Sequence, residues 1–547
     1  MMKSKYLLYI LAGVCVLQAA CKRVLESEPQ DRLTGDLVFD EMDKNADNAK
    51  AFLYGIYAQL PPGYNRTENA YIDNATDDGM ASQDGDRTED FRKGRISPLN
   101  VTDNTWGTNY SGIRRANMFL SKIDKVPATA ELKRAWKAEA RFLRTLFYFE
   151  LMKRWGGVPL MGDTILKITD NLNFSRSTVE QTKNYILAEI ANYKDSLLPA
   201  NMNDADVGRA NKGAALALKA RLLLYWASPL YNPDNITQRW TDAANAAQEV
   251  TDLGVYTLSA DFPGLFITSK TTEMIFAKNG TPNQNVEQYN GPVGYLNAGA
   301  GKGLTSPSQE LVDAFPMNNG LPITDPLSGY VASKPYEKRD ARFEATILYN
   351  GKKWLNRSVE TFEGGLDKPG GIITQTKTGY YLRKFMGKFE SSTAYSNTIR
   401  PVILFRYAEV LLNFAEAKNE ESGPVKPVYD ALGLIRKRAG ITGTTYGLPA
   451  GITKDSMRSI IQNERRIELA FEEHRHWDIR RWKIAGKVMN APLSGMKIVK
   501  NTDGTFSYTR FAATTSAFDI TRMYWYPIPY SEIETNPNMK QNIGWEY

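Results

Sequence analysis

Long segments of the chain carry apolar residues at helical spacing. In ELKRAWKAEARFLRTLFYFELMKRWGG (131–157), apolar side chains every three or four positions share one face: Trp136, Ala140, Leu143, Phe147 and Leu151. The glycine pair at the end of this stretch is typical of a helix terminus. The same spacing predicts further helices at about 43–60, 178–197, 211–227 and 238–253, near SPSQELVDAF (306–315), in RYAEVLLNFAEAKNE (406–420) and in VYDALGLIRKRAG (428–440).

Two long segments lack this period. Residues 61–108 are rich in Asn, Asp, Gly and Thr, and residues 255–400 alternate short apolar pieces with Gly, Pro and Asn. This composition predicts loops and short strands. Long loops inside a compact domain are often functional. The pattern therefore predicts a mostly α protein. We expect tetratricopeptide-like helix pairs at about 43–60, 109–254 and 401–490, a loop-rich insertion with short strands, and a mostly irregular tail.

The N-terminus has the pattern of an export signal. A basic start, MMKSKY, precedes LLYILAGVCVL, an apolar run too short for a membrane span, which needs about 20 residues. Small residues in QAAC then lead to Cys21, as in a bacterial lipoprotein signal. We expect residues 1–20 to be removed, Cys21 to be lipidated and residues 21–42 to form a tether. A plain secretory signal with an incidental cysteine is the alternative.

Charge excludes one class of partner. The net charge of +7 is small for 547 residues, and basic residues are spread along the chain among matching acids. Nucleic-acid binding requires a concentrated positive surface, so no nucleic-acid partner is expected.

Catalytic motifs are also missing from the sequence. The chain has two histidines, His474 and His476, whose spacing places them on different sides of a helix. There is no HExxH or GxSxG, and GAGKG (299–303) lacks the spacing and the Ser or Thr of a phosphate loop. A glycoside hydrolase remains an alternative, because its two catalytic carboxylates are recognised by the distance between them in the folded protein and not by a sequence motif.

The stretch NERRIELAFEEHRHWDIRRWK (463–483) is the most densely charged. Its five acids offset six bases, and Glu464, Glu468 and Glu472 lie one helical turn apart. Spacing predicts that Glu468 pairs with Arg465, and Glu472 with Arg475. Buried arginines with carboxylate partners can fix how helices dock, so an architectural role is favoured.

This stretch also resembles the C-terminal signature of the SusD/RagB family, the surface glycan-binding lipoproteins of Bacteroidetes. Further blocks are similar to family blocks in the expected order. They are AEARFLRTLFYFELMKRWGGVPL, NKGAALALKARLLLYWAS, SQELVDAF, KRDARF, FRYAEVLLNFAEAKNE, IRKRAGI and YPIPYSEIETNPNMKQNIGW.

The resemblance implies four tetratricopeptide-like helix pairs within one domain, residues 43–547. Loop-rich residues 61–108 and 255–400 would pack on these helices and carry the ligand site. It also implies an outer-membrane lipoprotein that faces the cell surface and hands oligosaccharides to a SusC-like TonB-dependent transporter, without catalysis and without a cofactor.

A sugar site needs exposed aromatic rings beside polar groups. The loops offer such residues, which we take as candidate ligand contacts: Trp106, Tyr289, Tyr295, Asn74, Asp77, Asp78, Arg87 and Asn290. At least two of the three aromatic residues are expected to line the pocket. No metal site is assigned, although the Asp-rich segment ATDDGMASQDGD leaves calcium binding as an alternative.

Two other functions remain open. One is a secreted helical glycoside hydrolase, and the other is a tetratricopeptide scaffold that binds peptides. The sequence does not name the glycan.

Overall fold

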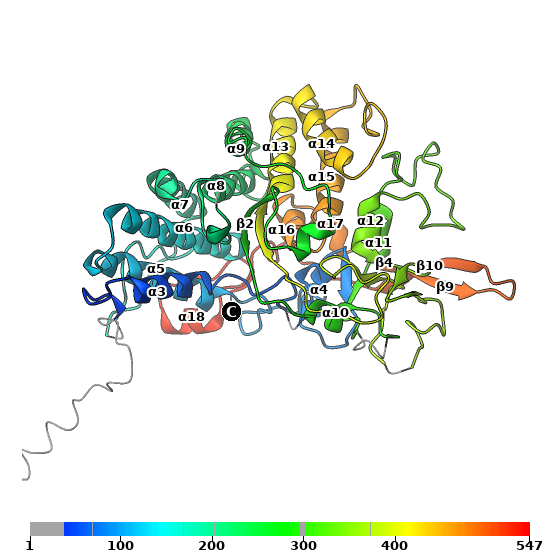
Figure 1. Cartoon of the computed structure of the whole chain (residues 1–547), viewed down its shortest axis with the longest axis horizontal. Coiled ribbons are helices and arrows are strands. Elements are labelled where there is room, and N and C mark those ends of the chain that lie inside the picture. Colours follow the sequence, from blue (N-terminus) through cyan, green and yellow to red (C-terminus); the bar gives the residue numbers. More distant parts are fainter. Residues whose placement is uncertain are drawn as a thin grey trace, which may run out of the picture.

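The computed structural model describes residues 38–546 except Glu68, Ile168, Met202, 296–300 and Ile372. The expected signal peptide, Cys21 and most of the tether lie outside this part of the chain. Helices form one side of the molecule in Figure 1. The main ones are α3 (Asp47–Tyr57), α5 (Trp106–Lys122), α6 (Ala130–Trp155), α7 (Val179–Tyr193), α8 (Lys212–Ala227), α9 (Thr237–Thr251), α13 (Tyr407–Ser422), α14 (Lys426–Arg438) and α15 (Lys454–Glu468).

These helices pack as a chain of neighbours, which confirms the tetratricopeptide-like helix-pair arrangement. Helix α5 packs on α6, α6 on α7, α8 on α9, and α13 on α9, α14 and α15. Small residues allow close approach. A Cβ at Gly112 of α5 would lie 2.4 Å from the Phe147 ring of α6, and α9 buries Ala243 and Ala247. No helix in the described part of the chain is both long and apolar enough to cross a bilayer.

The loop-rich side carries short antiparallel strand pairs, as expected from its texture. They are β1 (Gly79–Ala81) with β3 (Thr305–Pro307), β2 (Met274–Lys278) with β8 (Val402–Arg406), β4 (Ile347–Leu348) with β7 (Tyr381–Leu382), and β5 (Lys353–Trp354) with β6 (Arg357–Ser358). Short helices lie between them, namely α4 (Thr88–Arg92), α10 (Asn285–Asn290), α11 (Gln309–Ala314) and α12 (Ala341–Thr346).

One hairpin was not anticipated. Strands β9 (Leu493–Lys500) and β10 (Phe506–Thr514) form a two-stranded ribbon that projects from the body, at the opposite end of the longest axis from α3 (Figure 1). The expected irregular tail follows it and contains the short helix α18 (Tyr530–Thr535).

Two apolar cores meet at the charged stretch. One core lies among the helices and includes Leu469 and Trp477, whereas the other lies under the loops and includes Ile467 and Phe471. Neighbouring residues thus point into different cores, which places residues 467–471 at the junction of the two sides.

Buried ion pairs lock this junction. Glu468 is 0% exposed and accepts hydrogen bonds from Arg342 of α12, Arg406 of β8 and Arg438 of α14. The full cluster, which we call the ionic lock, joins five cations to five carboxylates: Arg342, Lys384, Arg406, Arg436 and Arg438 with Glu273, Asp340, Glu464, Glu468 and Glu472. Charge is therefore balanced where water is excluded.

The expected pairing along one helix is wrong. Arg465 pairs with Asp478 at 2.7 Å, and Arg475 pairs with Asp77, 398 positions away. For Glu472 and Arg475 the reason is a break in the helix, whereas Glu468 bonds instead to arginines from other elements. Helix α15 ends at Glu468 and α16 (His474–Arg481) begins after a turn with φ of 62° at Phe471 and 65° at Glu473.

Backbone groups freed by this break are bonded by the lock itself. The Arg406 guanidinium donates to the Glu468 carbonyl at 2.9 Å, and the Lys384 ammonium donates to the Ala470 carbonyl at 2.9 Å. Buried carbonyls without partners would be costly, so the cations satisfy both side chains and main chain.

We expect Glu468→Gln to destabilise the protein strongly, because three buried guanidinium groups would lose their shared anion. The free energy of unfolding, measured by urea denaturation, should fall by about 3–5 kcal/mol. The control is Glu337→Gln, since Glu337 is 59% exposed and pairs with exposed Lys334. Equal small effects of the two substitutions would contradict a structural role for the lock.

Acid should weaken the lock in a defined direction. Burial would raise the pKa of the Glu468 carboxyl, but Arg438, Arg406 and Arg342 hold that pKa well below its usual range. As the pH falls below about 4.3, the unfolded chain binds the proton first, so stability present at neutral pH is lost. Urea denaturation between about pH 7 and pH 3 should show this loss, and Glu468→Gln should make it shallower.

Candidate functional site

The predicted acidic contacts are engaged within the protein. Asp77 accepts from Arg475 at 2.7 and 2.8 Å, and Asp78 accepts from Arg466 at 2.5 Å. Burial would raise the pKa of Asp77, but Arg466 and Arg475 hold it far below its usual range. These carboxylates fasten the first loop region to residues 463–483, and Asn74 beside them is 1% exposed.

The polar candidates Arg87 and Asn290 are bonded to different parts of the chain. Half-buried Arg87 donates to the Asn100 side chain at 2.9 Å, whereas Asn290, on α10, is 0% exposed and donates to the Asn69 carbonyl at 3.5 Å. The structure therefore does not gather the predicted polar residues at one place.

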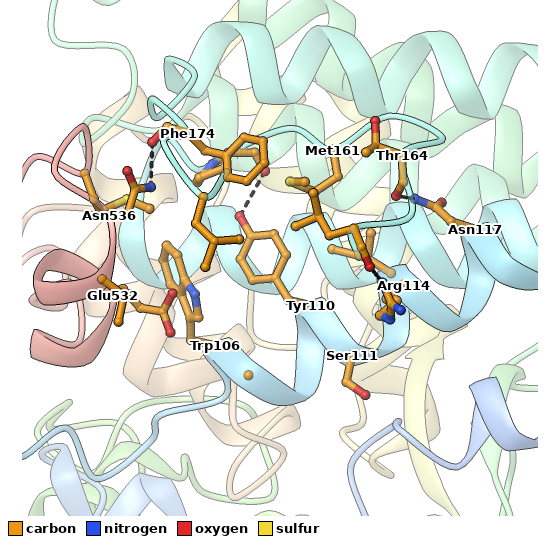
Figure 2. A pocket seen from close by; sticks show the side chains of 17 residues that line it. Trp106, Tyr110, Ser111, Arg114, Asn117, Met161, Thr164, Phe174, Glu532 and Asn536 are labelled. Carbon is orange, nitrogen blue, oxygen red and sulfur yellow. Dashed lines mark hydrogen bonds between the residues drawn. The ribbon is translucent and has the colours of Figure 1, made fainter. Parts of the chain in front are cut away.

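Trp106 lines a cavity of about 420 Å³ on the helical side (Figure 2). Its ring packs edge-on against Trp155 at 5.1 Å and is 4% exposed, while the Tyr110 hydroxyl donates to the Pro159 carbonyl at 2.9 Å. Burial raises the pKa of Glu532 across from this ring. The indole is thus largely covered, and Trp106 begins α5 as a packing residue.

Neither Tyr289 nor Tyr295 lines this cavity. The cavity therefore does not contain two of the three predicted aromatic residues. Tyr289, on α10, has the Lys302 ammonium 4.8 Å from its ring centroid. Tyr295 is 6% exposed, and the Arg357 guanidinium covers its ring face at 3.7 Å.

A second hollow of about 590 Å³ lies where the two loop-rich regions meet the hairpin; we call it the loop groove. Its lining comes from the first region (Ser82, Asp84), the second (Glu363, Lys368, Gly370, Gly371, Ile373, Thr374, Gln375, Thr376, Lys377) and the hairpin (Lys497, Phe511, Ala513). The first two segments are those that the sequence analysis assigned to the ligand side, whereas the hairpin was not anticipated there.

The floor of the loop groove is a hydrogen-bonded polar layer. The Ser82 and Ser306 hydroxyls lie 2.6 Å apart, and the Lys377 backbone N–H donates to the Ser306 hydroxyl at 2.9 Å. The Thr376 hydroxyl donates to the Tyr380 carbonyl at 2.7 Å. Because these groups bond one another, the floor is held in one arrangement.

Phe511 supplies an aromatic ring to the wall. It pairs with Gly495 across the hairpin and shares a face with Lys497, because alternate residues of a strand point the same way. A Cβ at Gly495 would lie 2.7 Å from the Thr378 Cα and 2.9 Å from the Phe511 ring. Glycine therefore lets the hairpin approach the loop and leaves the half-buried Phe511 ring beside the hollow.

This arrangement offers a ring, amides, hydroxyls and charges without an evident reaction centre. Within the described residues, no group of three His, Cys, Asp or Glu side chains is placed to hold a metal ion. The two histidines are separate, since His474 contacts Arg465 and His476 contacts Tyr526 at 2.8 Å. Burial lowers the pKa of both imidazoles well below the usual range.

Sequence comparison decides the family. Residues 272–545 match the sequence model of the SusD family. The chain belongs to the SusD family. Residues 26–224 match a second SusD-like model, which is described as starch-binding and associating with the outer membrane.

Individual SusD-like proteins agree along nearly the whole chain. SusD-like protein P38 of Formosa agariphila is 26% identical over 511 residues, which span 89% of this chain and 92% of that protein. A SusD-like crystal structure from Bacteroides fragilis has 27% identity and a TM-score of 0.79, covering 95% and 100% of the two chains. A laminarin-binding SusD-like protein shares the fold at 22% identity, with a TM-score of 0.64 and coverage of 92% and 99%.

Sequence reasoning missed Phe511 and Lys497, although a signal existed in this SusD-family chain. Asp503–Gly504 lies between segments in which apolar and polar residues alternate, and this pattern is a strong indicator of a hairpin. Recognising it would have placed aromatic Phe511 on an exposed ribbon.

Trp106→Ala should separate packing from ligand contact. We expect the free energy of unfolding to fall by about 3–5 kcal/mol, because the indole fills a space against Trp155. Oligosaccharide affinity of the protein that remains folded, measured by calorimetry, should be unchanged. A selective loss of affinity without loss of stability would return Trp106 to the ligand site.

Proposed function

We propose that this SusD-family chain is a cell-surface lipoprotein of the outer membrane. It binds oligosaccharides in the loop groove and passes them to a SusC-like TonB-dependent transporter. The observation that carries the proposal is the meeting of both loop-rich regions and the hairpin around one open, polar hollow that contains an aromatic ring.

The chemistry of the loop groove suits a sugar. A pyranose ring presents apolar C–H faces, which pack against aromatic side chains, and a rim of hydroxyls, which need donors and acceptors. Phe511 and the 57% exposed Ile373 supply apolar surface. Gln375 lies beside them and uses its carbonyl oxygen to hold the Gly370 N–H at 3.0 Å, which leaves its amide nitrogen to face a ligand.

Binding without cleavage fits the carboxylates of this hollow. A glycoside hydrolase needs one carboxyl group that stays protonated at neutral pH. The Lys377 ammonium instead lowers the pKa of the Asp84 carboxyl, and Glu363 pairs with Lys368 at 2.8 Å. The Asp84 carboxyl therefore favours the ionised form, which supports a binding protein over the hydrolase alternative.

Phe511→Ala should weaken oligosaccharide binding by about tenfold or more, because the ring face would be lost. Calorimetry with a panel of purified neutral and acidic oligosaccharides measures the affinity. Phe506→Ala is the matched control, since Phe506 is half-buried on the opposite face of the same hairpin, against Phe362. Loss of binding in both variants, or in neither, would contradict the proposed site.

The same titrations distinguish binding from hydrolysis. The wild-type protein should leave each oligosaccharide intact, with no new reducing ends after prolonged incubation. Release of reducing ends that depends on Asp84 or Glu363 would favour the hydrolase.

Cys21→Ser should release the protein from membranes, because a thiol is required for the proposed lipid attachment. Cell fractionation should find the wild-type chain with the outer membrane and the variant in soluble fractions. Cys15→Ser is the control, since Cys15 lies within the proposed signal peptide. Membrane retention of Cys21→Ser would contradict the anchor.

A further inference from the structure

Lysine side chains surround the loop groove in excess of acids. Lys368, Lys377 and Lys497 line it. The carboxylates that line the same hollow are Asp84 and Glu363. The groove therefore carries more positive than negative charge.

Two of these lysines are positioned beside the aromatic ring. The Lys368 ammonium lies 5.8 Å from the Phe511 ring centroid and is held by Glu363. Lys497 occupies the same hairpin face as Phe511, two positions from Gly495 on the neighbouring strand. A sugar stacked on Phe511 would thus have ammonium groups at its edge.

Neutralisation of these lysines is incomplete. Lys497 is exposed, and its ammonium group has no ion-pair or hydrogen-bond partner among the residues that the structure describes. Lys377 pairs with Asp84, whose side chain is 95% exposed, and such surface pairs are weak because water screens both charges. An anionic ligand can therefore meet Lys497 directly and compete with Asp84 for Lys377.

We propose that the loop groove selects acidic oligosaccharides, in which a carboxylate or sulfate ester on the ring meets Lys497 while the sugar face stacks on Phe511. This inference rests on the proposed function and specifies its ligand class. Carboxylate and sulfate present the same anionic oxygens to an ammonium group, so the shared chemistry is an anionic substituent on a pyranose. Neutral oligosaccharides would forgo the interaction with Lys497.

Calorimetry with three sets of oligosaccharides tests this selectivity. The sets are neutral gluco- and xylo-oligosaccharides, oligogalacturonates as the carboxylate arm, and carrageenan oligosaccharides as the sulfate arm. We expect at least one acidic set to bind about tenfold more tightly than the neutral sets, and its affinity to fall as salt rises from about 0.05 to 0.5 M. The arm that binds identifies the anion.

Lys497→Met then probes the residue. It should lower affinity for the acidic set by about threefold to tenfold and flatten the salt dependence, because Met keeps the stem and removes the charge. Lys500→Met is the matched control: Lys500 is exposed on the opposite face of the same strand, 5.5 Å from the Phe362 ring. Circular dichroism verifies that both variants are folded.

The outcomes separate the two proposals. Binding of neutral oligosaccharides with equal or greater affinity, unaffected by Lys497→Met, would overturn acidic selectivity and leave the binding function standing. An equal effect of Lys497→Met and Lys500→Met would also overturn it, because the effect would then be one of overall charge. Absence of binding to every set would overturn both the selectivity and the proposed function.

Discussion

The fold depends on one carboxylate that three arginines share. Glu468 ends α15, and the guanidinium groups around it come from α12, β8 and α14, so a single buried anion holds together parts of the chain from both cores. Desolvated ions are costly unless paired, and the balance of five cations with five carboxylates meets that condition. Such a cluster tolerates few geometries, because bidentate guanidinium bonds are directional. It therefore specifies how the loop-rich side sits on the helices.

Position at the junction explains why the charged stretch resists a simple helical interpretation. Residues 467 to 471 send side chains into two cores, and α15 ends within this stretch at Glu468. The turn at Phe471 and Glu473 follows, and it leaves main-chain carbonyls that Arg406 and Lys384 then bind. The same few residues therefore provide both the apolar contacts with the two cores and the ionic contacts between them.

Features of this molecule that depend on contacts between nearby residues were predictable from the sequence, whereas contacts between residues far apart in the chain were not. Helices α6, α8 and α13 were predictable because their signals are local periodicities and caps. The pairing of Asp77 with Arg475 was not predictable, because the partners are 398 positions apart and the sequence around Asp77 does not indicate that it is buried. For the same reason loop polarity alone did not show that Asp77 and Asp78 pair with arginines. The two loop-rich regions that line the loop groove were predicted as ligand-side segments, whereas the proposed roles of Phe511 and Lys497 depend on Gly495 bringing a hairpin against Thr378.

The hairpin and α3 lie at opposite ends of the longest axis of the molecule (Figure 1). If the chain preceding α3 attaches the protein to the membrane, the whole body can pivot about that end. A slight tilt about the attachment then carries the loop groove through a wide arc, while the ion-locked body keeps its own shape. Reach toward cargo and alignment with a neighbouring protein would then come from pivoting of the whole body, with no rearrangement inside it.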